Sequence, residues 1–196
     1  MNRLVLRVPN ENNAPSLFGK PDAFLLTLGI IAMCSMICEG TMFDWSGVYF
    51  RRVLEVRPGL SGAGYAAFMS TMASGRFIAD RLTTKFGIKK MLLLSGTLTA
   101  SGLMVAVIFP YFFSAMFGFM LVGAGVSAVV PLVYSAAGRS AVLPPGMALA
   151  TVSTIGYLGF LFGPPLIGFV AQASSLGIAF TMIAVMGAAI AIMSSR

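Results

Sequence analysis

The sequence is poor in charged residues. Lys, Arg, Asp and Glu together make up 10% of its 196 residues, whereas a soluble domain carries roughly 25%. Hydrophobic residues account for 58% of the chain, and its mean hydropathy is +0.91. A chain of this length cannot hide so much apolar surface from water, so lipid must be part of its solvent. The composition therefore predicts an integral membrane protein in contact with a lipid bilayer.

The residue types that build metal sites and catalytic centres are also scarce. The chain has no histidine and six acidic residues, and its two cysteines, Cys34 and Cys38, lie four apart on one apolar stretch, where a disulfide has poor geometry. We therefore expect no metal and no cofactor, and these counts argue against an enzyme. The net charge of +7 comes from short basic clusters between apolar runs. That pattern is typical of membrane topology, so no nucleic-acid partner is expected.

Six apolar runs are long enough to cross a bilayer, whose core needs about 20 residues of helix. They cover residues 24–43, 60–79, 91–109, 112–137, 147–171 and 176–193. Because the runs are continuous and do not alternate with polar residues, helices are favoured over a β-barrel. We predict an all-α membrane domain of six transmembrane helices over residues 22–196. Residues 1–21 are polar and are interpreted as a cytoplasmic arm or the remnant of a central linker.

The distribution of lysine and arginine predicts the orientation of the chain. With a cytoplasmic N-terminus, ten basic residues fall on the cytoplasmic side, at positions 3, 7, 20, 76, 81, 85, 89, 90, 139 and 196. The opposite side holds only Arg51, Arg52 and Arg57. Both termini are therefore expected in the cytoplasm.

Two acidic residues near the end of the first run are candidates for chemistry. Glu39 follows fifteen mostly apolar residues, and a carboxylate inside a membrane must face water, a partner or a ligand. It can take up a proton there, which suits proton coupling or polar substrate binding; the alternative is an ion pair with a nearby arginine. Asp44 is a candidate for substrate binding at a cavity mouth or for pairing with Arg51 or Arg52. Trp45 beside it is typical of the aromatic belt at a membrane interface.

The fourth and fifth runs are rich in glycine and proline. Gly156, Gly159 and Gly163 fall on one helical face, where missing side chains let another backbone approach. Pro164 and Pro165, followed by Gly168, are expected to bend the fifth helix because proline removes backbone donors. Such surfaces serve either tight static packing or helices that rock against one another.

The stretch GRFIADRLTTKFGIKK, residues 75–90, is interpreted as one short cytoplasmic turn between the second and third helices. It combines charged residues with two glycines: Gly75, Arg76, Asp80, Arg81, Gly87, Lys89 and Lys90. An Asp-Arg pair after a glycine, followed by a glycine and two basic residues at this position, resembles the signature loop of the major facilitator superfamily. Three further stretches resemble the C-terminal half of poorly characterised bacterial inner-membrane facilitators: EGTMFDWSGVYF, GAGVSAVVPLVYSAAGR and GYLGFLFGPPLIGF.

The resemblance covers roughly residues 20–196 and implies a fold and a function. The fold would be one half of a major facilitator, built from 3+3 inverted repeats in a bacterial inner membrane. The function would be secondary active, proton-coupled transport of a small solute by alternating access, together with a complementary six-helix half. Glu39, Tyr134 and Asp44 would line the cavity, and Asp80 would latch the cytoplasmic gate against Arg139. The alternative is a non-transporting membrane protein, either a truncated product or an assembly partner of such a half.

Overall fold

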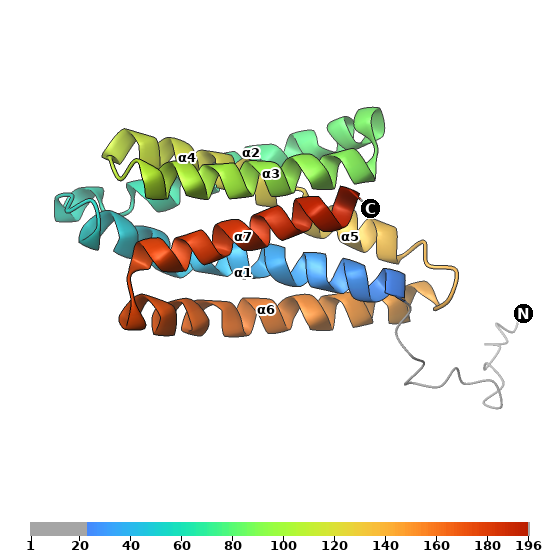
Figure 1. Ribbon diagram of the computed structural model, residues 1–196. Coiled ribbons are helices and arrows are strands. Elements are labelled where there is room, and N and C mark those ends of the chain that lie inside the picture. The colour runs from blue at the N-terminus through green and yellow to red at the C-terminus, as the bar shows by residue number, and fades with distance from the viewer. Residues whose placement is uncertain (1–22, 196) are drawn as a thin grey trace, which may run out of the picture.

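The computed structural model describes residues 23–195, which form a bundle of roughly antiparallel α-helices (Figure 1). The elements are α1 (Ala23–Arg52), the 3-10 turn η2 (Pro58–Leu60), α2 (Ala63–Phe86), α3 (Ile88–Ile108), α4 (Phe112–Val126), α5 (Val129–Ala137), α6 (Pro145–Ala173) and α7 (Leu176–Ser195). The predicted arm at residues 1–21 lies outside the described residues, as do the basic residues at positions 3, 7, 20 and 196. The orientation of the chain stays a prediction.

Five segments are long and apolar enough to cross a membrane by length and composition. They are α1, α3, the α4–α5 pair, α6 and α7. Helix α2 has 24 residues, enough for about 36 Å, but its second half carries Arg76, Asp80, Arg81 and Lys85. The all-helical membrane fold is confirmed, whereas a sixth crossing by α2 and the 3+3 inverted repeat stay predictions.

The predicted turn at residues 75–90 is wrong over most of its length. Helix α2 continues to Phe86 and α3 begins at Ile88, so Gly87 alone makes the turn. Gly87 has a φ of 81°, a conformation that glycine adopts readily, and its N–H donates to the Thr83 carbonyl at 2.8 Å. Between Gly75 and Gly87 there is no helix-breaking residue. Loss of apolar character was therefore mistaken for loss of helix.

The fourth predicted helix is divided into α4 and α5 just before Pro131. Proline has no N–H to donate to the carbonyl four residues earlier, which belongs to Ser127. The helical pattern resumes with the Leu132 N–H, which donates to the Ala128 carbonyl at 3.1 Å. In contrast, α6 remains one continuous helix through Pro164 and Pro165 (Figure 1).

Helix α1 runs through the middle of the bundle, between α6 on one side and α7 and α2 on the others (Figure 1). Its C-terminal half is fixed by an aromatic cluster. Tyr49 stacks on Phe180 of α7 with ring centroids 4.9 Å apart, and Phe119 of α4 packs against both rings. The Tyr49 hydroxyl donates to the Ala106 carbonyl of α3 at 2.7 Å, which satisfies its buried oxygen. The cluster fixes the face of α1 that carries Tyr49 against α3, α4 and α7. Glu39 and Asp44 therefore lie on other faces of the helix.

Candidate functional site

Glu39 forms an ion pair with Arg76. The two residues lie near the middle of α1 and α2, and the Arg76 Nη2 is 3.5 Å from the Glu39 Oε1. The Glu39 side chain is 14% exposed and the Arg76 side chain 55% exposed. The guanidinium therefore offsets a carboxylate that the surrounding helices largely remove from solvent. An ion pair with a nearby arginine was the alternative predicted for Glu39. The structure shows an arginine partner, but it is Arg76, which comes from the stretch predicted as the cytoplasmic turn.

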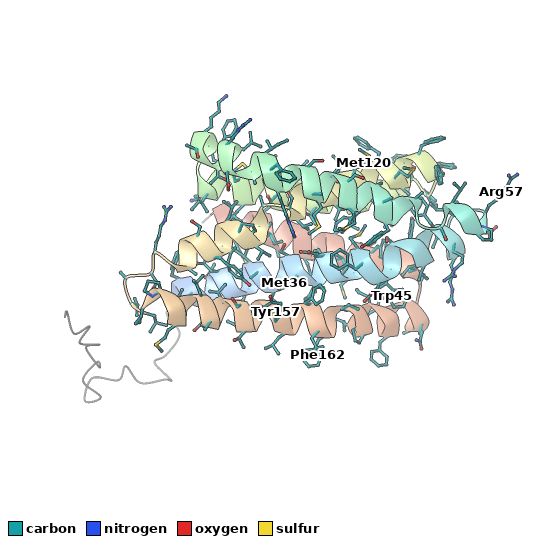
Figure 2. The ribbon with its side chains drawn as sticks, turned by 180° about the vertical axis from the view of Figure 1, so that it is seen from behind. Met36, Trp45, Arg57, Met120, Tyr157 and Phe162 are labelled. Carbon is teal, nitrogen blue, oxygen red and sulfur yellow. The ribbon has the colours of Figure 1, made fainter. Side chains whose placement is uncertain are left out.

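The ion pair lies at the edge of a small cavity of about 230 Å³ between α1, α2, α5 and α6. Its other lining residues are apolar or aromatic: Met36, Phe43, Val130, Tyr157 and Phe160. Figure 2 shows Met36 of α1 and Tyr157 of α6 on neighbouring helices. The Tyr157 residue is 61% exposed, so the cavity opens on the surface of this chain. A carboxylate, a guanidinium and a phenol at one opening can bind a polar solute or exchange a proton.

Asp44 lies one and a half turns beyond Glu39 on α1 and is exposed. Within residues 23–195 it forms no ion pair, so pairing with Arg51 or Arg52 is not realised in this structure. Its side chain borders two hollows, of about 570 and 340 Å³. Phe43 and Phe160 belong both to the larger hollow and to the Glu39 cavity, so the two acidic residues face adjoining spaces.

Tyr134 lines neither the cavity of Glu39 nor the hollows that Asp44 borders. It lies on α5 and packs against an apolar cluster to which α1, α2, α3, α5, α6 and α7 all contribute. Its hydroxyl is buried and has no hydrogen-bond partner among the described residues. Tyr134 does not line the Glu39 cavity; Tyr157 is the tyrosine that does. Its assignment as a cavity residue stays a prediction.

Among the residues assigned to the cytoplasmic gate, Gly75 and Arg76 lie near the middle of α2, and Asp80 and Arg139 do not form the predicted latch. Asp80 is exposed on α2, and Arg139 is exposed just after α5. No ion pair between them occurs in the described part of the chain. Lys89 and Lys90 open α3, next to the glycine turn.

The glycine face of α6 packs against α1. A Cβ at Gly159 would lie 2.6 Å from the Met33 carbonyl oxygen, and one at Gly163 would lie 3.2 Å from the Ile37 Cα. At Gly156 the nearest atom would be the Met36 sulfur, at 3.1 Å, and at Gly168 it would be the Trp45 ring, also at 3.1 Å. Because these contacts hold α6 close to α1, α6 forms one wall of the cavity that Glu39 lines.

Trp45 contributes to the contact between α1 and α6. Its Nε1–H donates to the Pro164 carbonyl at 3.2 Å, and Figure 2 shows the ring between these two helices. The half-buried indole is therefore a contact between helices, which the interfacial-belt interpretation did not predict. Across residues 23–195, no three His, Cys, Asp or Glu side chains are grouped so as to hold a metal ion.

Sequence reasoning missed Arg76 as the partner of Glu39, and it missed the aromatic lining from Phe43, Tyr157 and Phe160. One signal was available: Glu39 and Arg76 are opposite charges well inside long helices, where each needs a partner. Exposed aromatics on a membrane helix gave no such signal, because a lipid-facing helix has the same composition.

Comparisons with known proteins agree on one family. The protein-family model described as Major Facilitator Superfamily matches residues 24–195 of this chain. An uncharacterised MFS-type transporter of Yersinia pestis is 38% identical over 185 residues, which cover 94% of this chain and 48% of that protein. The membrane protein MosC of Rhizobium meliloti is 35% identical, with 85% of this chain and 41% of that protein covered. The chain thus spans about half the length of the curated relatives it matches.

A solved structure supports the same fold. The POT family transporter PepTSo superposes with a TM-score of 0.73 at 16% identity, over 88% of this chain and 36% of that one. At that identity the likeness extends to the helical arrangement alone.

Proposed function

The chain belongs to the Major Facilitator Superfamily, and we propose that it is the C-terminal six-helix half of a transporter that moves a small solute by alternating access. The membrane is the inner membrane of a bacterium, with both termini in the cytoplasm. In this mechanism two six-helix units rock about a central site, which opens to one side at a time. The proposal is supported by the family, by the coverage of about half of each curated relative, and by a polar site that opens on the surface of the bundle.

The observation that carries the mechanism is the 3.5 Å ion pair between Glu39 and Arg76. We propose that Glu39 couples transport to protons. Protonation of the carboxylate would remove its attraction for the guanidinium, so Arg76 could turn toward the solute or the other half. Loss of the proton would restore the pair. Protonation of one carboxylate on α1 would thereby alter the contact between α1 and α2. A local change of this kind can shift the equilibrium between two conformations of a helical bundle.

The second part of the proposal concerns the complementary half. Helix α6 carries large apolar side chains with little cover from this chain, and Figure 2 shows Phe162 pointing away from the bundle. Leu161 is 66% exposed, Phe162 63% and Phe169 72%. We propose that part of this surface packs against the other six helices, with Asp80 and Arg139 closing the cytoplasmic gate in a state of the cycle in which their helix ends meet.

The test of assembly is co-expression with the portion of the Yersinia pestis relative that this chain does not match. A half-transporter should form a stable complex that copurifies through size-exclusion chromatography. A chain that is equally stable and monodisperse alone, and binds nothing, would instead favour the alternative of a non-transporting product.

The test of coupling uses the assembled pair in vesicles loaded with a pH-sensitive dye. A panel of solutes is added, and solute-dependent proton movement is recorded. In the Glu39→Gln variant, gradient-driven uptake should be lost while exchange of labelled for unlabelled solute is largely kept. The matched control is Glu55→Gln, an exposed carboxylate outside the cavity, which should behave as the parent. Equal loss of uptake and exchange in Glu39→Gln would indicate a binding or folding role and contradict proton coupling.

A further inference from the structure

Asp44 is a carboxylate inside a membrane helix for which the described chain supplies no counter-ion. It lies about two turns before Arg52, the last residue of α1. A charge at that depth is unfavourable against hydrocarbon unless it faces water, a partner or a ligand. Residues 23–195 supply no ion pair for Asp44, and the basic side chain that shares a hollow with it, Arg51, borders the smaller of its two hollows and not the larger, so the charge on the larger side is open to a ligand.

The larger of the two hollows that Asp44 borders has the size and lining of a ligand site. Its volume of about 570 Å³ lies in the range of small-molecule pockets. Asp44 is the one charged residue in a lining that is otherwise apolar or aromatic: Phe43, Trp45, Val48, Phe160, Leu161, Pro164 and Pro165. Among residues 23–195, no basic side chain borders this hollow to repel a cation; Arg51 borders the smaller neighbouring hollow, which Asp44 also borders.

The aromatic walls are held in defined positions. The Trp45 indole is fixed by its hydrogen bond to the Pro164 carbonyl. Phe43 and Phe160 meet edge to face, with ring centroids 6.1 Å apart. Aromatic rings attract cations through their faces, and an arrangement of rings with a nearby carboxylate is the chemistry that recognises quaternary ammonium groups.

We infer that this hollow binds an organic cation, a positively charged group carried on an apolar or aromatic body, with Asp44 as counter-ion and Trp45 and Phe160 as walls. The inference names a substrate class for the proposed transporter and takes its transport role from that proposal. The binding itself requires only residues of this chain. The neighbouring Glu39 is already neutralised by Arg76, so Asp44 holds the negative charge that remains for the ligand.

The experiment measures binding to the chain alone in nanodiscs of neutral phosphatidylcholine. Trp45 is the only tryptophan of the chain, and it borders both this hollow and a neighbouring one lined by Arg51 and Arg52. The Asp44 variants therefore decide whether a change in its emission comes from this hollow. The probe is tetraphenylphosphonium, and the matched control is tetraphenylborate, which has nearly the same shape and the opposite charge. We expect saturable quenching by the cation and only non-saturable partitioning of the anion.

The variants distinguish binding that depends on the Asp44 carboxylate from partitioning of the probe into the lipid. Asp44→Asn should weaken tetraphenylphosphonium binding at least about tenfold, which corresponds to about 1.4 kcal/mol. Asp44→Glu should retain the affinity to within about threefold, which shows that the fold tolerates a change at this position. Glu55→Gln is the acidic control and should bind as the parent does.

Three results would overturn the inference: no saturable binding of the cation by the parent chain, equal affinity in Asp44→Asn and the parent, or saturable binding of tetraphenylborate with the same affinity. None of these results depends on assembly with another half or on uptake. If this chain binds the cation but the assembled pair transports nothing, the inference stands and the proposed function fails. If the assembled pair transports a solute but this chain binds no cation, the proposed function stands and the inference fails.

Discussion

Glycine brings helices together on two sides of this bundle in different ways. On the side of α3, α4 and α7, backbones meet directly: a Cβ at Gly102 would lie 2.5 Å from the Gly118 carbonyl oxygen, and one at Gly96 would lie 2.5 Å from the Ala191 nitrogen. On the side of α1 and α6, only Gly159 is so close to a carbonyl. At Gly156 and Gly168, the nearest atoms belong to the side chains of Met36 and Trp45.

The difference concerns how much each contact can yield. Two backbones in contact cannot separate locally without moving whole helices, whereas a methionine side chain can change rotamer. We therefore expect the α3–α4–α7 side to be the more rigid part of the bundle. The α1–α6 side carries both acidic residues and the hollows beside them. It has one comparably close backbone contact, at Gly159, whereas the other glycines between these two helices meet side chains or, at Gly163, a backbone atom at 3.2 Å. A polar site thus adjoins the packing surface that is easier to shift.

The largest effect is expected from a substitution on the rigid side. In Gly118→Ala the new Cβ would meet the Gly102 carbonyl oxygen, and it would lie 3.1 Å from the Ala106 nitrogen. Because neither backbone can give way alone, we expect a loss of about 3 kcal/mol in the free energy of unfolding. The measurement is the detergent-unfolding midpoint in mixed micelles. Gly59→Ala, where nothing lies within 4 Å, is the matched control; a midpoint for Gly118→Ala equal to that of this control would contradict the rigidity of this side.

An intermediate effect is expected from breaking the ion pair on the site side. Arg76→Gln leaves the Glu39 carboxylate without the one ion-pair partner that residues 23–195 give it. Since the arginine side chain is 55% exposed, solvent screens the pair, and we expect a loss of about 1 kcal/mol.

The double variant sharpens this result. Adding Glu39→Gln removes the uncompensated charge, so it should recover most of the loss, and a double-mutant cycle would measure the coupling. Arg81→Gln, on the exposed part of the same helix, should leave the unfolding midpoint unchanged. Additive losses in the cycle would show that the two side chains do not stabilise one another.

Much of the helical framework could be predicted from hydropathy alone. The run 91–109 corresponds to α3 and the run 176–193 to α7 within a few residues, because both stay apolar along their whole length. The end of α2 could not be predicted in this way, since the helix continues beyond the apolar stretch as far as Gly87. The break before Pro131 was missed for the opposite reason: apolar character persists through it, and only the missing N–H marks it.

The candidate site was predictable as a set of residue types but not as a set of contacts. Glu39 and Asp44 stood out because each is a charge in an apolar context. Which charge meets Arg76 depends on how α1 and α2 are rotated about their axes, and packing with α4, α6 and α7 fixes that rotation. Hydropathy along one helix carries no information on it. The hollow beside Asp44 was unpredictable for the same reason, since two helices form its walls.

The smallest effect, and the finest test of the comparison, is expected within α6 itself. In Gly156→Ala the new Cβ would lie 3.1 Å from the Met36 sulfur, which a rotamer change can move. Alanine is also more favourable in a helix than glycine by about 1 kcal/mol. The free energy of unfolding should therefore stay within about 1 kcal/mol of that of the parent. Gly159→Ala, one turn away, meets the Met33 carbonyl and should cost about 2 kcal/mol. Equal losses in unfolding free energy at the two positions would mean that α6 is held along its whole length as firmly as α3. The candidate site would then not lie beside a more easily shifted packing surface.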